Sequence, residues 1–504
     1  GNAMKNTLTL RVHRSLWLLS TSILLSACAA VGPDYKAPEL LSPATWSLWS
    51  SSSKELPRNE GMQGAPEHKW WAAFQDSVLD QLETRVLESS PDLKTAMLHY
   101  EQARSQRSVT ASQQVPEVKL QGGAIRQRQS EYAAGDRVLD VMAPNNRDAV
   151  AKSLSEPYTS YQGGFDASWE IDLWGRVRRA VEAADADIAN SLALLDQTRL
   201  VISSDLAMAY IDLRTTQRLL KLTRDDITAL RERTSMMESR SKHGLANDLD
   251  LERQRLQLAD LEEQMPPLLE QEAQSKNRIC LLLGLRPGDL AKELAAESAP
   301  AAAMVLPQYK LGVPSELAGR RPDIRAAEAR LHQATAAIGE AQAQLYPSVR
   351  LGLRFGLDSY EAGKFGDWGS RFWSIGPSLD LPIFDGGRRR ATVTLRELRQ
   401  QEAAIEFQRT VLRAWQEVDD ALTSYAAEQE RQQRLLVKAQ SSADVYQLAQ
   451  ARERAGLVDY LNVIDAQRTD IQARRDVVAS QGRTQLRFIA IYRALGGGVA
   501  ETAD

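Results

Sequence analysis

Two long stretches of the chain carry apolar residues at seven-residue intervals. One stretch runs from about residue 175 to residue 243 and the other from about residue 387 to residue 455, and neither contains a proline. The apolar positions of the first stretch are Val181, Ile188, Leu195, Ile202, Leu206, Leu213, Leu220 and Ile227. A heptad spacing indicates a helix that packs against other helices. At about 1.5 Å per residue, we expect each stretch to form one helix on the order of 100 Å long.

A glycine follows each long stretch, at a point where the chain is expected to reverse. These glycines are Gly244 and Gly456, and a reversal between helices often needs a residue with positive φ. From there the chain is predicted to return as helix, to Gly284 in the first case and to Gly496 in the second. The pair Pro266-Pro267 lies inside the first returning helix and should kink or break it.

Four shorter segments alternate apolar residues with charged or small ones, which predicts β-strands with one apolar face. They cover about residues 118–125, 165–173, 349–357 and 373–383. Two interpretations are open: two hairpins lying on a helical core, which composition alone favours, or strands of a membrane barrel. Aromatic residues at the strand ends fit the interfacial girdles of a barrel; they are Tyr158, Tyr161, Trp174, Phe372 and Trp373. Four strands cannot close a barrel, so the second interpretation requires several chains.

The chain also contains an internal repeat. The run SPDLKTA at residues 90–96 returns as RPDIRAA at residues 321–327, and Pro116 matches Pro347 at the same separation of 231 residues. The turn glycines and the closing glycines are each separated by 212 residues. Such constant spacing indicates a duplicated scaffold, in which each half has a short helix, two strands, a long helix and a returning helix. The halves differ in length by about 20 residues in one segment, which in the first half lies between Pro116 and Gly175.

The repeat suggests a division of the chain into five parts. Residues 1–27 precede the mature protein, and residues 28–85 form an anchored N-terminal segment and the start of an equatorial region. Residues 86–300 form repeat 1, residues 301–498 form repeat 2, and residues 499–504 form a tail.

The N-terminus has the pattern of a bacterial lipoprotein signal. Residues 1–3 look like a cloning remnant, and residues 4–27 form a signal peptide with a positive start and an apolar core too short to span a membrane. The core ends in Leu25-Ser26-Ala27-Cys28, which matches a lipobox. We expect Cys28 to become the first mature residue and to carry a diacylglyceryl group and an N-acyl chain. A lipoprotein retained in the inner membrane carries Asp directly after the lipidated cysteine. Ala29 occupies this position here, which indicates the outer membrane.

Composition excludes several functional classes. The 504 residues carry a formal charge of −4, so no basic surplus points to nucleic acid as a partner. Cys28 and Cys280 are the only cysteines, which excludes a disulfide framework, and Cys280 is expected to be buried. The five histidines are isolated, and the sequence shows no metal site, cofactor-binding loop or catalytic constellation. We therefore expect neither an enzyme nor, in the absence of a long apolar run after residue 27, a transmembrane helix.

Several short motifs together resemble one known family. They are Val31-Gly32-Pro33-Asp34-Tyr35, Trp70-Trp71 with Phe74, Arg320-Arg321-Pro322-Asp323, Pro382-Ile383-Phe384-Asp385-Gly386-Gly387, and Ala455-Gly456-Leu457-Val458-Asp459-Tyr460-Leu461 followed by Asp465-Ala466-Gln467-Arg468. This set is similar to the OprM/NodT-type lipoprotein branch of the TolC outer-membrane factors, the outer-membrane components of tripartite RND efflux pumps. The resemblance extends from Cys28 to about Gly498.

The resemblance implies both an architecture and a function. The fold would be an α+β membrane protein: a homotrimer whose chains give four strands each to a twelve-strand outer-membrane β-barrel, continuous with a long α-helical periplasmic barrel and a mixed equatorial domain. The chain would be a lipid-anchored, passive exit duct in the outer membrane of a Gram-negative bacterium. It would conduct drugs or other small toxic compounds received from a periplasmic membrane-fusion adaptor and an inner-membrane RND transporter.

The two turns are expected to contact the adaptor, with plain structural turns as the alternative. The residues concerned are Gly244, Leu245, Asn247 and Asp248 at the first turn and Gly456, Leu457 and Asp459 at the second.

The helix after the second turn is expected to carry the pore gate. Leu461, Asp465 and Arg468 follow one another at spacings of four and three, so they share one helix face. The resemblance associates these positions with the pore constriction. On a threefold axis they would form a leucine ring and an aspartate ring, whose carboxylates repel one another unless cations or arginines lie near. Arg468 would supply that charge through an exposed pair worth about 0–1 kcal/mol; the alternative is an ordinary surface pair between Asp465 and Arg468.

Two other functions are kept open by the sequence. One is the exit duct of a type I protein secretion system, against which the lipobox argues. The other, from a different class, is a lipid-tethered coiled-coil scaffold without a pore. The sequence does not identify the cargo.

Overall fold

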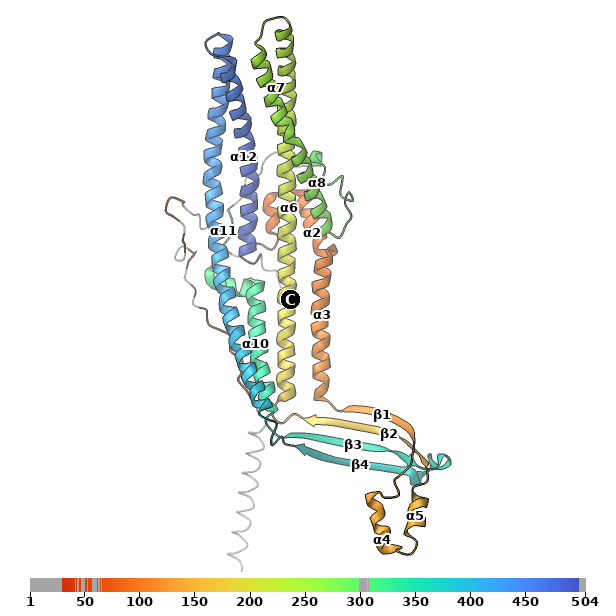
Figure 1. The fold of residues 1–504 in the computed structure, drawn as a ribbon. Helices are drawn as coiled ribbons and strands as arrows, with labels where there is room; N and C mark the ends of the chain where they lie inside the picture. The colour runs from red at the N-terminus through yellow and green to blue at the C-terminus, as the bar shows by residue number, and fades with distance from the viewer. Residues whose placement is uncertain are drawn as a thin grey trace, which may run out of the picture. The chain divides into compact units, whose positions relative to one another are not determined.

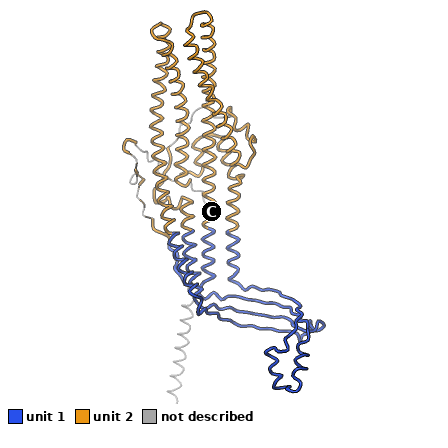
Figure 2. The backbone as a smooth tube through the Cα atoms, in the orientation of Figure 1, with its two compact units in different colours: residues 1–36, 103–188, 330–403 blue, residues 37–102, 189–329, 404–504 orange. Residues whose placement is uncertain are grey.

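The computed structural model describes residues 30–497, except for residues 41, 43–44, 47–49, 52, 57–60, 62–63, 65, 299–305 and 307 (Figure 1). The predicted signal peptide, Cys28 and the C-terminal tail lie outside the described residues. The chain forms two compact units (Figure 2). Unit 1 contains residues 1–36, 103–188 and 330–403, and unit 2 contains residues 37–102, 189–329 and 404–504. Each unit therefore draws on both halves of the repeat.

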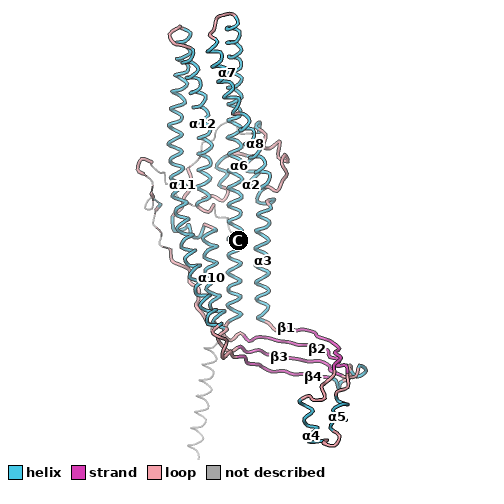
Figure 3. The backbone as a smooth tube through the Cα atoms, in the orientation of Figure 1, coloured by secondary structure: helices cyan, strands magenta, loops and turns pink. Residues whose placement is uncertain are grey.

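Long helices account for most of the described chain, and a sheet distinguishes unit 1 (Figure 3). The helices are α2 (Ser77–Ser89), α3 (Pro91–Ala111), α4 (Leu139–Met142), α5 (Arg147–Leu154), α6 (Arg176–Lys242), α7 (Asp248–Glu263), α8 (Met265–Leu282), α9 (Leu317–Arg320), α10 (Pro322–Ala343), α11 (Arg388–Arg454) and α12 (Tyr460–Ala494). The strands are β1 (Glu117–Gln127), β2 (Tyr158–Ile171), β3 (Ser348–Ser359) and β4 (Arg371–Asp380). The two predicted long helices are confirmed as α6 and α11, each 67 residues long. The heptad residues of α6 are buried, apart from the half-buried Ile188.

The four strands of unit 1 form one antiparallel sheet in the order β1-β2-β3-β4. Leu120 lies opposite Phe165, Phe165 opposite Phe355, and Phe355 opposite Trp373, so these side chains share an apolar face. Leu120 and Trp373 remain 73% and 69% exposed. The interpretation of two hairpins on a helical core is therefore wrong, because one continuous sheet presents an uncovered apolar face.

Two strand boundaries differ from the expectation. β2 begins at Tyr158 rather than near residue 165, because it pairs with β1 as far as Gln127. β4 ends at Asp380 rather than near residue 383, because Asp380 pairs with the first residue of β3, Ser348. That residue follows Pro347, which has no backbone N–H to extend the ladder.

Two residues expected in an aromatic girdle, Tyr158 and Phe372, lie on the opposite face of the sheet. Tyr158 is seven residues before Phe165 in β2, so it points to the polar face and its predicted place in the apolar band is wrong. Phe372 directly precedes Trp373 in β4, so the two side chains point to opposite faces. Phe372 shares the polar face with Arg354, whose guanidinium carbon lies 5.6 Å from the ring centroid. The prediction for Phe372 is therefore wrong, and the ring takes part in a cation–π contact on the polar face instead.

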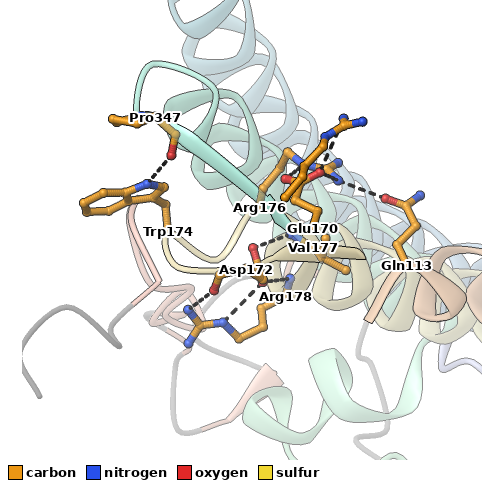
Figure 4. A network of polar contacts seen from close by, with 9 residues as sticks. Gln113, Glu170, Asp172, Trp174, Arg176, Val177, Arg178 and Pro347 are labelled. Atoms are coloured by element: carbon orange, nitrogen blue, oxygen red, sulfur yellow. Dashed lines mark hydrogen bonds and ion pairs between the residues drawn. The ribbon is translucent and has the colours of Figure 1, made fainter. Parts of the chain in front are cut away.

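A network of polar contacts connects β2 to α6 (Figure 4). The Asp172 carboxylate accepts hydrogen bonds from the backbone N–H groups of Val177 and Arg178, at 3.1 and 2.9 Å. Such N–H groups in the first turn have no partner inside the helix. The Trp174 indole donates to the carbonyl of Pro347 at 2.7 Å. These contacts fix the end of β2 both to the start of α6 and to the residue before β3.

The two returning segments differ in continuity. The first is divided into α7 and α8, and Gln264 separates them just before Met265-Pro266-Pro267. The predicted break is thus confirmed, and the prolines occupy the first turn of α8, where a missing N–H costs little. The second returning helix, α12, runs without interruption for 35 residues.

The hydrophobic core of unit 2 is rich in aromatic rings. Phe74, from the short 3-10 helix Trp70–Phe74, is fully buried and contacts Phe488 of α12 edge-on, with 5.8 Å between ring centroids. Tyr492 of α12 stacks on Trp70, and Tyr425 of α11 also contacts Phe488. The N-terminal segment with the two tryptophans is therefore an integral part of this core.

None of the helices in the described part of the chain combines the length and apolar character that a membrane crossing requires.

Candidate functional site

Both hairpin tips of unit 2 end their long helix in the same way. Two backbone hydrogen bonds close each end, with N···O distances of 2.8–2.9 Å: Leu245 to Arg240 and Gly244 to Ser241 at the first tip, and Leu457 to Arg452 and Gly456 to Glu453 at the second. Gly244 and Gly456 have φ values of 68° and 69°, which residues with a Cβ rarely adopt. This is a Schellman motif, and it confirms the predicted positive φ at both turns.

The tips differ in how the returning helix begins. At the first tip the side chain of Asn247 accepts a hydrogen bond from the N–H of Leu249 at 2.9 Å, and Asp248 accepts one from the hydroxyl of Ser241 at 2.6 Å. At the second tip Asp459 occupies the position before α12, but its side chain caps no backbone N–H. The first tip is therefore more firmly fixed than the second.

Each tip also presents an apolar side chain to solvent. Leu245 and Leu457, which follow the two glycines, are 69% and 73% exposed. Figure 1 shows the α6–α7 tip and the α11–α12 tip at the same end of unit 2. The residues predicted to contact an adaptor are therefore gathered at one end of this unit.

The three predicted gate residues share an exposed face of α12. Leu461 is 38% exposed, and Asp465 and Arg468 are exposed as well, whereas Val463 and Ile464 between them are buried. Asp465 lines a groove of about 470 Å³ between α11 and α12. Among the described residues no ion pair joins Asp465 to Arg468.

Polar contacts that the sequence did not reveal hold the second hairpin against the first. The Tyr460 hydroxyl at the start of α12 donates to the side-chain oxygen of Gln254 in α7 at 3.1 Å. Further along α12, Arg474 pairs with Asp470 at 3.1 Å and with Asp226 of α6 at 2.9 Å. Burial raises the pKa of Asp226, although the guanidinium of Arg474 acts against this shift. Any movement of α12 away from α6 and α7 has to break these contacts.

In unit 1, the segment that follows the predicted lipid attachment site is fixed to α6 and α10. The Arg179 guanidinium donates to the carbonyl of Val31 at 3.1 Å and pairs with Asp34 at 2.8 Å. The Tyr35 ring stacks on His332 of α10, with 4.1 Å between centroids. The motif near the start of the chain is thus bound at a defined place in unit 1.

Within the described residues no group of His, Cys, Asp and Glu side chains has the arrangement of a metal site. Cys280 is 1% exposed, as predicted, and is not part of a disulfide.

Comparison with known proteins defines the class: the chain belongs to the outer membrane efflux protein family, whose model matches residues 82–285 and 313–497. The resemblance to the TolC-type outer-membrane factors is thereby confirmed. The protein has an α+β channel fold, is located in the outer membrane, and serves as an exit duct of efflux pumps rather than as an enzyme.

Particular relatives cover nearly the whole chain. It is 30% identical to the pyoverdine export outer membrane protein OpmQ of Pseudomonas putida, over 96% of this chain and 97% of that protein. It is 31% identical to the outer membrane protein OprJ of Pseudomonas aeruginosa, over 95% of each. The structure of the outer-membrane channel OprN has a TM-score of 0.81 at 30% identity, covering 93% of this chain and 99% of that one. The Campylobacter jejuni CmeC outer membrane channel shares the fold, with a TM-score of 0.83 at 21% identity over 94% and 96% of the two chains.

Proposed function

We propose that the functional channel is a homotrimer, in which three copies of the four-stranded sheet close one twelve-stranded barrel through the outer membrane. The sheet itself carries this proposal, because β1 and β4 each leave one edge without a partner in the described chain. Each unpaired backbone N–H or C=O group costs on the order of several kcal/mol in a bilayer. Closing the sheet into a barrel pairs these groups and removes that cost. The exposed apolar face supplies the lipid-facing band; its residues are Val118, Leu120, Phe165, Leu353, Phe355, Trp373, Ile375 and Leu379.

The need for a lumen favours three chains over two. A barrel built from this sheet has a multiple of four strands. Side chains fill the interior of a barrel of about eight strands, whereas larger barrels leave a channel. Twelve is the smallest multiple of four above that limit. The polar face, with the ion pair of Asp166 and Arg354 at 3.4 Å, would then line the duct.

The long helices would extend the duct into the periplasm, where the two tips meet a membrane-fusion adaptor that couples to an inner-membrane RND transporter. The transporter supplies the energy and the duct is passive. Relatives of this chain are named for the export of pyoverdine, antibiotics, toluene and solvents. This supports small toxic compounds as the cargo, and it favours efflux over type I protein secretion.

The full-length protein in detergent tests this proposal. We expect the mass of a trimer in solution and single-channel conductance steps in planar bilayers. A trimer that needs no detergent and shows no conductance would indicate the coiled-coil scaffold instead. A monomer or a dimer that conducts would contradict the twelve-stranded barrel.

The lipid anchor is a separate part of the proposal, and it falls on Cys28, outside the described residues. The clamp that Arg179 forms on Val31 and Asp34 supports it, because a fixed segment directly after Cys28 would hold the acyl chains near one place on unit 1. Protein extracted from membranes should exceed the mass of the polypeptide 28–504 by three acyl chains and glycerol, and an unmodified mass would exclude lipidation. Cys28→Ala should loosen anchoring without abolishing transport, since the barrel itself holds the trimer in the bilayer.

The gate is proposed on the exposed face of α12. In a trimer, Leu461 and Asp465 turned to the axis would form two stacked rings, and repulsion among three carboxylates would make the closed state depend on Arg468 or on cations. Arg468 lies on the same exposed face of α12, within one helical turn of Asp465, so it would stand next to the aspartate ring. Such exposed pairs are weak, about 0–1 kcal/mol, which suits a gate that an adaptor opens.

The tips are proposed as the adaptor contact. Cysteines introduced as Asn247→Cys or Asp459→Cys should form crosslinks with the adaptor in cells. Arg434→Cys, an exposed position in the middle of α11, serves as the control and should not. Capture from the control alone would place the contact along the helices instead.

A further inference from the structure

The loop between β1 and β2 is a folded insert rather than a simple turn. It covers residues 128–157 and contains the 3-10 helix Ala134–Val138, α4 and α5 (Figure 1). The loop between β3 and β4 covers only residues 360–370. The insert accounts for the extra length that the sequence places between the first strand and the first long helix.

Contacts within the insert give it a defined shape. The Arg147 guanidinium pairs with Asp140 at 3.0 Å and donates to the backbone carbonyl of Glu131 at 3.3 Å. Leu139 and Ala151 form its small interior and are 9% and 1% exposed. Arg147, the first residue of α5, thus links that helix to α4 and to the segment that follows β1.

Three apolar side chains nevertheless face away from this interior. Val141 and Met142 follow Val138 by three and four residues, so the three side chains share one face of a helical turn. They are 52%, 82% and 77% exposed. We call these three residues the insert patch. A gathered apolar face of this kind on a folded element marks an interaction surface rather than a solvated loop.

The shorter loop carries a second exposed apolar surface. Trp368 is 74% exposed, and the Arg371 guanidinium lies 4.5 Å from its ring centroid and holds the ring in place. Trp368 lies three residues before Arg371, the first residue of β4. The large ring is therefore presented next to the free edge of the sheet.

We propose that the insert patch of one chain packs against Trp368 of the adjacent chain, forming a clasp at each seam between subunits. This rests on the proposed trimeric barrel. In that barrel, antiparallel alternation continues only if β1 of one chain pairs with β4 of the next. The end of β1, at Gln127, then lies beside the start of β4, at Arg371. The insert follows Gln127 directly, and the loop with Trp368 ends at Arg371, so the seam brings the two surfaces together.

The charge of the insert favours a second copy of this chain over a membrane surface as the occupant. Residues 128–157 contain four basic and five acidic residues. An outer leaflet rich in anionic headgroups attracts segments with a basic surplus, and the insert has none. An aromatic side chain of a neighbouring subunit matches the patch better, because aromatic and aliphatic side chains form the dry centre of subunit contacts.

Paired cysteines in the full-length trimer test the clasp. In a Cys280→Ala background, Val141→Cys with Trp368→Cys reports the clasp, and Gln127→Cys with Arg371→Cys reports the seam itself. A short bis-maleimide should link both pairs into covalent trimers on denaturing gels. Crosslinking of the seam pair without the clasp pair would overturn the clasp and leave the barrel intact. Failure of both pairs would overturn the barrel together with the clasp.

A stability comparison provides a second, independent readout. Val141→Asp with Met142→Asp should lower the temperature at which the trimer dissociates in detergent, because it places two charges in an apolar contact. Leu154→Asp in the same insert, 52% exposed and outside the patch, should leave that temperature unchanged. Equal shifts for both variants would contradict the clasp. An environment-sensitive fluorophore at Val141→Cys that responds only to added lipopolysaccharide would overturn it in favour of a lipid contact.

Discussion

The two halves of the chain have long helices of equal length and differ in their returning helices. α6 and α11 are equal in length and end in the same Schellman turn. The first half returns as two helices, α7 and α8, whereas the second returns as the single helix α12. α12 also buries more side chains than α7 and α8 together. Duplication therefore preserved the dimensions of the scaffold, and the second returning helix became an interior element of unit 2.

The difference extends to the proposed gate. The counterparts of Asp465 and Arg468, 212 residues earlier, are Arg253 and Leu256. The first half thus has no acidic residue where the second half would form its aspartate ring. We propose that the first hairpin kept a supporting role after the duplication, while the second acquired the gate.

The largest difference in stability is expected between substitutions at Arg321 and Ser90, the equivalent residues that directly precede the short helices α10 and α3. Arg321 donates to the carbonyl of Ala494 at 2.7 Å and pairs with Glu417 at 2.6 Å, and its side chain is 6% exposed. The side-chain hydroxyl of Ser90, its counterpart, accepts a hydrogen bond from the N–H of Leu93 at 3.4 Å. Arg321→Ala should lower the free energy of unfolding by about 2–3 kcal/mol, since it leaves a buried carbonyl unpaired. Ser90→Ala should cost about 0.5–1 kcal/mol.

Denaturant unfolding of each purified variant, followed by circular dichroism, measures this pair. Equal losses would show that the two positions have kept one role.

A smaller effect is expected at the two tips. Asn247 caps α7 through the N–H of Leu249, whereas Asp459 caps no N–H of α12. Asn247→Ala should destabilise the first turn of α7 by about 1 kcal/mol. Asp459→Ala should change the first turn of α12 by about 0.5 kcal/mol or less. Hydrogen exchange of the amides in these two turns separates the cases, and similar losses of protection would contradict the difference between the tips.

A further effect depends on pH and concerns a residue outside the repeat. Glu83 of α2 is fully buried and accepts a hydrogen bond from the Ser203 hydroxyl at 2.8 Å. Burial raises the pKa of Glu83 well above its ordinary value. Above about pH 4.3 the unfolded chain therefore loses this proton while the folded chain keeps it, so stability falls as pH rises until the raised pKa is reached.

Glu83→Gln removes this loss and keeps an acceptor for Ser203. It should raise the thermal midpoint at pH 7 and leave it nearly unchanged at pH 4. Glu88→Gln, on the exposed face of the same helix, is the matched control and should change neither value. A gain of equal size at both pH values would contradict the buried, protonated carboxyl.

Features determined by local chemistry were predictable from the sequence. The heptads gave the length of α6 and α11, the glycines gave both turns, and Pro266-Pro267 gave the break between α7 and α8. Strand alternation gave the two faces of the sheet, and applying it strictly to Phe372 would have placed that ring on the polar face. These signals act within a few residues, so one chain is enough to read them.

Contacts between distant segments were not predictable. The pair of Asp226 and Arg474 joins residues 248 positions apart, and the clamp of Arg179 on Val31 joins residues 148 positions apart. Apolar spacing also does not reveal that a charged residue is buried. Asp226 is an example, although this residue directly precedes the heptad residue Ile227. Helical spacing predicted that the three proposed gate residues share one face of α12. It did not predict that Asp465 lies beside α11, which only the fold shows.

The central claim, that the second hairpin carries the gate and the first supports it, has one direct test. Resting single-channel conductance is measured in planar bilayers for Asp465→Ala with Arg468→Ala, and for Arg253→Ala with Leu256→Ala at the equivalent positions of the first hairpin. The account predicts a several-fold rise in conductance, and entry of large antibiotics such as vancomycin into cells, for the first variant only. Unchanged conductance in a correctly assembled Asp465→Ala, Arg468→Ala trimer, or an equal rise in both variants, would contradict it.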